Sequence, residues 1–173
     1  MKKFGIFVGR FCPVHIGHEA VINSMLSECG AENCLLVLGS ANAPMSLRNL
    51  FSYEERRSFL KILYPQIKII GVPDYSTDTE WMLALDDIIS TAGIELENTV
   101  FFGGCEEDIH FFYEFERKCQ LLNRFDGSTP KISATEVRDA LIQERSLEQL
   151  INPALSAEVR RTFAIKWDRF RKM

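Results

Sequence analysis

Short apolar segments alternate with amphipathic helical segments over most of this chain of 173 residues. The segment Cys34–Leu38 is apolar at every position, which is typical of a strand buried on both faces of a sheet. Strands joined by helices pair in parallel with right-handed crossovers. The order therefore predicts an α/β protein, with a Rossmann-like open parallel sheet of about five strands and helices on both faces. The predicted strands are residues 4–8, 34–38, 67–72, 99–102 and 119–122.

Helix-capping residues precede the helical segments between these strands. The clearest is the capping box of Ser52 and Glu55, which opens a helix that ends before Pro65. Apolar side chains at four-residue spacing indicate a helix after the first strand, and Gly30 ends it. The predicted helices are residues 16–29, 53–63, 80–89 capped by Thr79, and a segment capped by Ser133 or Thr135 that reaches residue 142.

The C-terminal segment has a different pattern. Asn152 is a favourable N-cap and Pro153 a favourable first-turn residue, and apolar residues then recur every four positions from Leu155 to Trp167. This spacing predicts an amphipathic helix that packs on the rest of the chain. We expect residues 1–145 to form the α/β domain and residues 146–173 to form a helical extension packed on that same domain.

Composition excludes several classes of protein. A hydrophobic share of 46% and a net charge of −4 are ordinary for a globular protein and argue against a general nucleic-acid binder. The apolar run that begins at Phe4 is stopped by Arg10, so it is too short for a signal peptide or a membrane span. The five cysteines contain no C-x-x-C pair, which disfavours a disulfide framework or a zinc ribbon. We expect a cytoplasmic protein that binds neither nucleic acid nor membranes.

The stretch GRFCPVHIGH, residues 9–18, directly follows the first predicted strand. Ligands of open parallel sheets bind at the carboxyl ends of the strands. His15 and His18 lie on the first turn of the next helix, whose N-terminus attracts anions, and Arg10 adds a positive charge. Taken alone, a helix cap with one packed imidazole explains this stretch equally well. Zinc is less favoured, because the third histidine, His110, has no cysteine nearby that would complete a ligand set.

A second stretch, ISATEVR at residues 132–138, opens a late helix with two hydroxyl residues and Arg138. These groups suit phosphate oxygens, although alone they describe a capped helix with a surface arginine. The chain has no G-x-x-x-x-G-K-[ST] loop and no G-x-G-x-x-G after the first strand. A P-loop enzyme and the usual dinucleotide fingerprint are therefore disfavoured.

The motifs GRFxPxHxGH and ISxTxxR, in this order, resemble the signatures of the HIGH-motif nucleotidyltransferase superfamily. The opening Gly-Arg-Phe resembles the nicotinamide-mononucleotide adenylyltransferases of archaeal and bifunctional bacterial type. GSANAPMSLRNLFSYEERRSFL is similar to that family's Gly-Ser…Arg-Asn-Pro-Phe…Glu-Glu-Arg segment, and PDYSTDTEWM is similar to its Asp…Asp-x-x-Trp segment. The resemblance extends from residue 4 to about residue 142.

The resemblance implies an enzyme that joins ATP and nicotinamide mononucleotide into NAD and pyrophosphate. It implies Mg²⁺ bound through the ATP phosphates, no metal bound by the protein itself, and these two small molecules as partners; whether the chain forms a homo-oligomer is left open. The implied catalytic residues are His15, His18 and Arg138. The implied ATP-binding residues are Gly9, Arg10, Phe11, Gly103, Arg124, Ser133 and Thr135. The implied mononucleotide-binding residues are Arg48, Asp78 and Trp81.

Four positions depart from the family's pattern: Cys12, Val14, Leu50 and Ala134. They leave the acceptor open, so nicotinate mononucleotide and phosphopantetheine stay as alternative acceptors. A nucleotide-sensing protein without catalysis is a further alternative. Without the resemblance, Trp81 would be interpreted as a core aromatic on an amphipathic helix.

Overall fold

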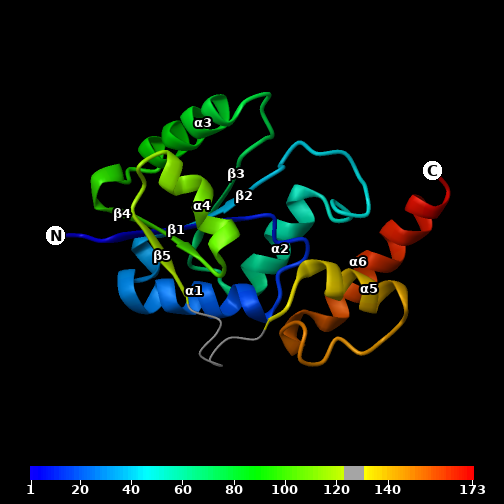
Figure 1. The fold of residues 1–173 in the computed structure, drawn as a ribbon. Coiled ribbons are helices and arrows are strands. Elements are labelled where there is room, and N and C mark those ends of the chain that lie inside the picture. Colours follow the sequence, from blue (N-terminus) through cyan, green and yellow to red (C-terminus); the bar gives the residue numbers. More distant parts are fainter. Residues whose placement is uncertain (123–130) are drawn as a thin grey trace.

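The computed structural model describes residues 1–122 and 131–173. Five strands form one parallel sheet in the order β3-β2-β1-β4-β5 (Figure 1). This confirms the predicted Rossmann-like sheet and the position of every predicted strand to within one or two residues. The strands are β1 (Phe4–Gly9), β2 (Cys34–Leu38), β3 (Lys68–Gly71), β4 (Thr99–Gly103) and β5 (Cys119–Leu121).

The helices largely follow the predicted segments, with two differences. The third helix is capped by Thr77, whose hydroxyl accepts from the Glu80 N–H at 3.2 Å, so the prediction of Thr79 as its cap was wrong. A capping box with Glu80 makes Thr77 the better cap. A short helix after β4 was not predicted. The helices are α1 (Ile16–Cys29), α2 (Tyr53–Leu63), α3 (Asp78–Thr91), α4 (Glu106–Glu114), α5 (Ala134–Ile142) and α6 (Pro153–Arg171), with 3-10 turns η1 (Ala31–Asn33) and η2 (Leu96–Asn98).

The sheet has an apolar core on each face. Along β2, Leu36 and Leu38 point to one face and Leu35 and Val37 to the other, and all four are buried. The first face packs against α1, α2, α5 and α6, and the second against α3 and α4 (Figure 1). Helices on both faces leave the carboxyl edge of the sheet as the place where loops meet.

The C-terminal segment contacts the α/β domain at several points. α6 packs along α2, and Lys166 Nζ lies 3.0 Å from Glu55 Oε1. Leu155 and Val159 of α6 are fully buried in the larger core. Just before α6, the Asn152 side chain donates to Glu19 Oε1 at 2.9 Å. The expected boundary at residue 145 stays a prediction.

The five cysteines all lie in the described part of the chain, and no disulfide joins them. Burial and, to a smaller extent, neighbouring Cys29 together raise the pKa of the Cys34 thiol to about 12. Within residues 1–122 and 131–173, no helix combines the length and the apolar composition that a membrane span needs.

Close contact between β1 and α1 gives a test of this packing. A Cβ added to Gly5 would lie 2.5 Å from Met25 Cγ and 3.1 Å from Cys29 Sγ. We expect Gly5→Ala to lower the free energy of unfolding by about 1–3 kcal/mol, because it overpacks the core. Urea unfolding followed by circular dichroism measures this loss. In a Met25→Ala background the added methyl has room, so its cost should shrink; an equal cost in both backgrounds would contradict the packing explanation.

Candidate active site

The loop after β1 is anchored by an aromatic side chain. Phe11 has a φ of 49° and is 1% exposed. The centroid of its ring lies 5.1 Å from that of Phe7 and 4.7 Å from that of His18. Phe11 therefore forms an apolar support beside His18, while Arg10 stays half-buried at the edge of the sheet.

His15 and His18 orient each other. His15 is the N-cap of α1, and its Nδ1 accepts from the N–H groups of Gly17 at 3.1 Å and His18 at 3.3 Å. His18 Nδ1 accepts from the His15 N–H at 3.2 Å, and the two rings stack with centroids 3.7 Å apart. A nitrogen that accepts a hydrogen bond carries no proton, so in the neutral form each ring holds its proton on Nε2. Each imidazole therefore has a donor at Nε2.

The first amides of α1 are engaged within the protein. Besides Gly17 and His18, the Ile16 N–H donates to the Leu150 carbonyl at 3.0 Å, and the Glu19 N–H donates to the His15 carbonyl at 3.1 Å. An anion at this edge therefore meets side chains rather than unpaired helix amides. Capping α1 and lining a cavity are therefore compatible roles for the two histidines.

A cavity of about 250 Å³ brings both motifs together. The first motif contributes both histidines and the loop after β1, and the second contributes the start of α5. A neighbouring cavity of about 420 Å³ shares Arg48, Thr135 and Arg138 with it. The lining residues of the smaller cavity are Arg10, Phe11, Cys12, His15, His18, Arg48, Ala134, Thr135 and Arg138.

Arg138 connects the two motifs directly. Its Nη1 donates to the Cys12 carbonyl at 2.7 Å, and its Nη2 donates to Thr135 Oγ1 at 3.1 Å. Arg138 lies on the first half of α5, which Ser133 caps by accepting from the Glu136 N–H at 3.2 Å. The fork of the guanidinium therefore fixes the start of α5 against the loop after β1.

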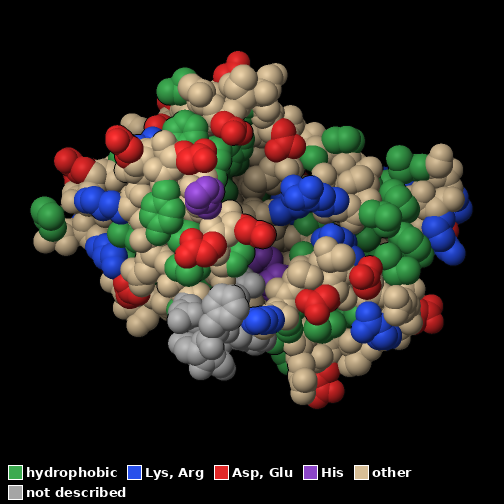
Figure 2. All heavy atoms as spheres, viewed as in Figure 1, with side chains coloured by type: hydrophobic (Ala, Val, Ile, Leu, Met, Phe, Trp, Pro, Cys, Tyr) green, Lys and Arg blue, Asp and Glu red, His purple; other side chains and the backbone are tan. Residues whose placement is uncertain are grey.

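The cavity has the electrostatic character of an anion site. Three arginines line it, and none of its described lining residues is a carboxylate. Burial lowers the pKa of Arg10, and the positive charge of Arg48 lowers it further. Like charges brought together in this way are stabilised by an anion that bridges them. Figure 2 shows basic side chains and a histidine around a hollow on this face.

A protein-bound metal does not fit this site. The described residues contain no group of three or more His, Cys, Asp or Glu side chains that could hold a metal ion. Both histidines use Nδ1 for the helix cap, and the surrounding charges are positive. The third histidine, His110, is exposed on α4 beside Glu114.

A separate cavity, of about 350 Å³, lies over α3 and the loop before it, and we call it the second cavity. Trp81 is half-buried and packs edge-to-face on Phe111, with ring centroids 5.5 Å apart and an interplanar angle of 78°. Trp81 is therefore both packed and exposed to the cavity. The residues that line the second cavity are Asp74, Tyr75, Thr77, Asp78, Trp81 and Phe111. The expected mononucleotide-binding residues Asp78 and Trp81 therefore come together there.

Three of the expected ATP-binding positions lie outside these cavities. A Cβ on Gly103 would come 2.3 Å from Ile109 Cγ2, so close packing of α4 on β4 already requires glycine there. The Gly9 carbonyl accepts from the Gly39 N–H at 3.0 Å, which continues the sheet beyond its last strand pair. Ser133 is exposed and serves as a helix cap. Arg124 lies outside the described residues.

The structure also adds residues that the sequence analysis did not single out. Tyr75 and Phe111 line the second cavity. Arg56 of α2 is buried beneath the loops after β1 and β2. A signal for Arg56 existed, because Arg56, Phe59 and Leu60 lie three and four residues apart and so share the buried face of α2.

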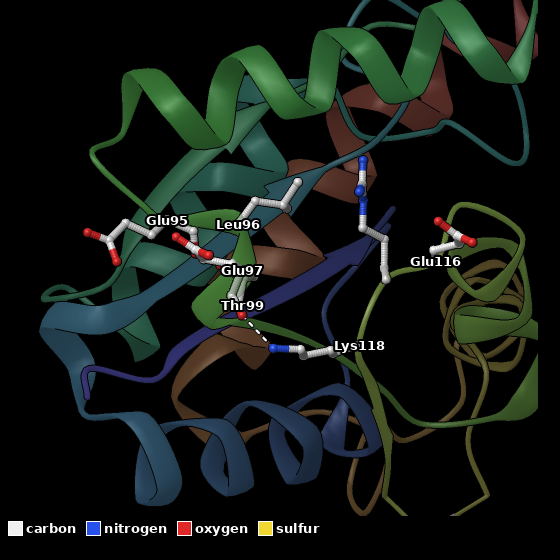
Figure 3. Close-up of a pocket in the computed structure, with 7 residues that line it drawn as sticks. Glu95, Leu96, Glu97, Thr99, Glu116 and Lys118 are labelled. Atoms are coloured by element: carbon white, nitrogen blue, oxygen red, sulfur yellow. Dashed lines mark hydrogen bonds between the residues drawn. The ribbon is translucent and has the colours of Figure 1, made fainter.

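A larger cavity, of about 530 Å³, lies at the opposite edge of the sheet (Figure 3). Its basic groups are already paired: Lys118 donates to the Glu97 carbonyl at 2.5 Å, and Arg117 lies 2.6 Å from Asp86. Parallel sheets bind ligands at the other edge, where the strands end. The cavity between the two motifs is therefore the candidate active site.

Fold and site together define an α/β protein with an anion site at the carboxyl edge of a parallel sheet. Comparison with known families is more specific. The family model described as cytidylyltransferase-like matches residues 6–140, and the chain belongs to this family. The expectation of a nucleotidyltransferase enzyme is confirmed.

Individual relatives agree with this assignment. A nicotinamide-nucleotide adenylyltransferase of Thermococcus onnurineus is 28% identical over 159 residues, which cover 87% of this chain and 79% of the relative. A solved bifunctional NMN adenylyltransferase/ADP ribose pyrophosphatase from Francisella tularensis superposes with a TM-score of 0.74 at 20% identity, covering 87% of this chain and 45% of that chain. A structure of the same description, complexed with AMP and a manganese ion, gives a TM-score of 0.68 at 21% identity and covers 87% and 44%. This chain thus spans less than half the length of the bifunctional proteins. The expected resemblance to nicotinamide-mononucleotide adenylyltransferases is confirmed.

The capping role of His15 can be separated from any chemical role. His15→Ala leaves the N–H groups of Gly17 and His18 without their acceptor, so we expect it to lower the free energy of unfolding by about 0.5–2 kcal/mol. His15→Asn supplies a side-chain oxygen that caps well, and its stability should stay close to that of the wild type. Thermal and urea unfolding of both variants measure the difference. Equal stability of His15→Ala and His15→Asn would contradict the capping role.

Proposed function

We propose that this protein joins ATP and nicotinamide mononucleotide to give NAD and pyrophosphate. The observation that carries the proposal is the single cavity where His15, His18 and Arg138 meet with Arg10 and Arg48. The relatives named above support the choice of reaction. A cytoplasmic location is part of the proposal.

The reaction needs positioning and charge stabilisation more than acid–base chemistry. An oxygen of the mononucleotide 5′-phosphate attacks the α-phosphorus of ATP, and the bond from that phosphorus to the bridging oxygen of the β-phosphate breaks. Pyrophosphate leaves with the electron pair of that bond. The attacking phosphate is already anionic, so no general base is required.

Each cationic or donating side chain of the cavity has a task in this scheme. His18 donates from Nε2 to the α-phosphate as its oxygens gain charge, and His15 and Arg138 hold the departing pyrophosphate. Arg10 holds ATP phosphates, and Arg48 holds the phosphate of the mononucleotide. The shared lining of the two neighbouring cavities by Arg48 and Arg138 supports a continuous path for the phosphates.

We assign the second cavity to the nicotinamide ring. The ring is flat and cationic, and stacking on the indole of Trp81 with Asp78 nearby suits both properties. Mg²⁺ would enter as part of the ATP substrate, bound through phosphate oxygens. The Francisella structure, complexed with AMP and a manganese ion, supports a divalent cation that accompanies the nucleotide.

One assay distinguishes the alternatives for the acceptor. Pyrophosphate release is measured with ATP and, in turn, nicotinamide mononucleotide, nicotinate mononucleotide and phosphopantetheine. Release with the first at a rate well above the others supports the proposal. Binding of ATP without release for any acceptor would instead favour a nucleotide-sensing protein.

The chemical role of His18 gives a sharp test. We expect His18→Ala to lower the rate of NAD formation by about 10²–10³-fold, because one donor to the developing charge is lost. His110→Ala is the matched control, since His110 is exposed on α4 and away from the cavity. His15→Asn should also lose activity while it keeps its stability. Near-normal turnover by His18→Ala would refute the assignment.

The role of Trp81 predicts an effect on one substrate only. We expect Trp81→Ala to raise the KM of the mononucleotide by about tenfold, on the order of the 1–2 kcal/mol of a ring interaction, with the KM of ATP unchanged. Trp81→Phe keeps a stacking surface and should recover part of the loss. Trp167→Phe on α6 is the control for the other tryptophan. Equal changes in both KM values for Trp81→Ala would contradict this subsite.

A further inference from the structure

Among the described residues, the Arg56 side chain bonds only to backbone carbonyls, and one of these belongs to Arg10, which lines the cavity of about 250 Å³ between the two motifs. We call this cavity the phosphate cavity. Arg56 is 2% exposed on α2. Its Nη1 donates to the carbonyls of Arg10 at 2.6 Å and Gly39 at 2.9 Å, and its Nη2 donates to the carbonyl of Ser40 at 3.1 Å. A single guanidinium thus bridges the loop after β1 and the loop after β2.

The buried charge of Arg56 belongs to no ion pair in the part of the chain that the structure describes. None of the ion pairs found in residues 1–122 and 131–173 includes Arg56. Burial lowers the pKa of Arg56, and the carboxylate of Asp74 offsets only part of that effect. Keeping this charge buried is therefore costly. Because its side chain bonds three carbonyls of two loops, a buried arginine here points to a role beyond filling space on α2.

The two bridged loops share an uncommon backbone conformation. Phe11 has a φ of 49° and Ser40 a φ of 52°, in the left-handed region that non-glycine residues seldom adopt. Arg56 bonds the carbonyl directly before Phe11, the carbonyl directly before Ser40, and that of Ser40 itself. Its three hydrogen bonds therefore hold both turns in place.

These turns carry groups of both cavities. The loop after β1 bears Arg10 and Phe11, which line the phosphate cavity. On the other loop, the Ser40 hydroxyl donates to Asp74 Oδ1 at 3.0 Å, and Asp74 lines the second cavity. A path of hydrogen bonds thus runs from the Arg10 carbonyl through Arg56 and Ser40 to Asp74.

We propose that Arg56 is a positioning residue of this enzyme. Its hydrogen bonds fix the position of the loop after β1 relative to the loop after β2, and its positive charge strengthens the binding of phosphates in the phosphate cavity. This proposal rests on the proposed function. The geometric part depends on the fork of three hydrogen bonds, and the electrostatic part depends on the charge alone, so two substitutions separate them.

Arg56→Lys keeps the charge and loses the fork, whereas Arg56→Gln loses both. We expect Arg56→Lys to lower kcat by at least about tenfold, because a small misplacement of reacting groups can lower a rate by up to about 10²-fold. The KM of ATP should stay within about threefold of the wild-type value, because the positive charge is kept. Arg56→Gln should show the same loss of kcat and, in addition, a KM of ATP raised about tenfold. Arg57→Lys and Arg57→Gln are matched controls on the same helix and should stay near wild-type values, because Arg57 does not line either cavity.

Circular dichroism and thermal unfolding establish that each variant is folded at the assay temperature. Wild-type kcat in folded Arg56→Lys would overturn the geometric part. Arg56→Gln with an unchanged KM of ATP would overturn the electrostatic part. A loss of activity that only follows the unfolded fraction would show a merely structural role and overturn both.

A binding measurement separates this proposal from the proposed function. Calorimetric titration with inorganic pyrophosphate needs no acceptor, and we expect about tenfold weaker binding by Arg56→Gln than by the wild type. If the wild type binds pyrophosphate but makes no NAD, the proposed function fails. The titration of Arg56→Gln then still tests whether the charge of Arg56 strengthens phosphate binding.

If neither Arg56 variant folds, the wild-type protein still provides a test. In a sample labelled with ¹⁵N-arginine, the Arg56 Nη protons should exchange slowly without ligand and shift when pyrophosphate is added. Fast exchange, or no shift at saturation, would overturn the proposal.

Discussion

The site depends on the central position of β1 in the sheet. β1 pairs in parallel with β2 on one side and β4 on the other, and the hydrogen bond from the Gly39 N–H to the Gly9 carbonyl extends the β1–β2 pairing past the strands. The loops after these two strands therefore leave the sheet side by side. Arg56 then joins them from below, and Arg138 joins the first loop to α5. Residues far apart in the sequence thus reach one cavity because parallel pairing places consecutive strand ends at one edge.

The two imidazoles serve the fold and the proposed chemistry with different nitrogens. Nδ1 of each ring accepts a backbone N–H at the start of α1, and this fixes both the orientation of the ring and the position of its proton. The donor at Nε2 is therefore preorganised before any substrate arrives. Preorganised donors need no rearrangement as charge develops, which is the condition under which they stabilise a transition state most effectively.

Much of this arrangement was predictable from local sequence. Apolar runs located the five strands. The capping box at Ser52, and the choice of Ser133 or Thr135 as a cap, located two helices, because these signals involve neighbours in the chain. α4 was missed because it is short and buries only Ile109 and Phe112, with no side-chain cap. The roles of Arg56 and of the Leu150 carbonyl at the start of α1 depend on contacts between distant segments. Local patterns predict that a buried arginine lies on a helix face but not which carbonyls it bonds.

The charge distribution explains how an acidic chain binds a phosphate-rich ligand. The net charge is −4, yet Arg10, Arg48 and Arg138 line a cavity with no carboxylate among its described lining residues. At physiological ionic strength charges act over about 8 Å, so a compact triphosphate experiences this local cluster, while an extended polyanion also meets the acidic remainder. Burial lowers the pKa of Arg10 and the nearby charge of Arg48 lowers it further, so without a ligand these two arginines repel each other. Phosphate oxygens replace that repulsion with charge-assisted hydrogen bonds. The resulting attraction holds the reacting phosphates in place, and a transfer that needs no general base depends on such positioning above all.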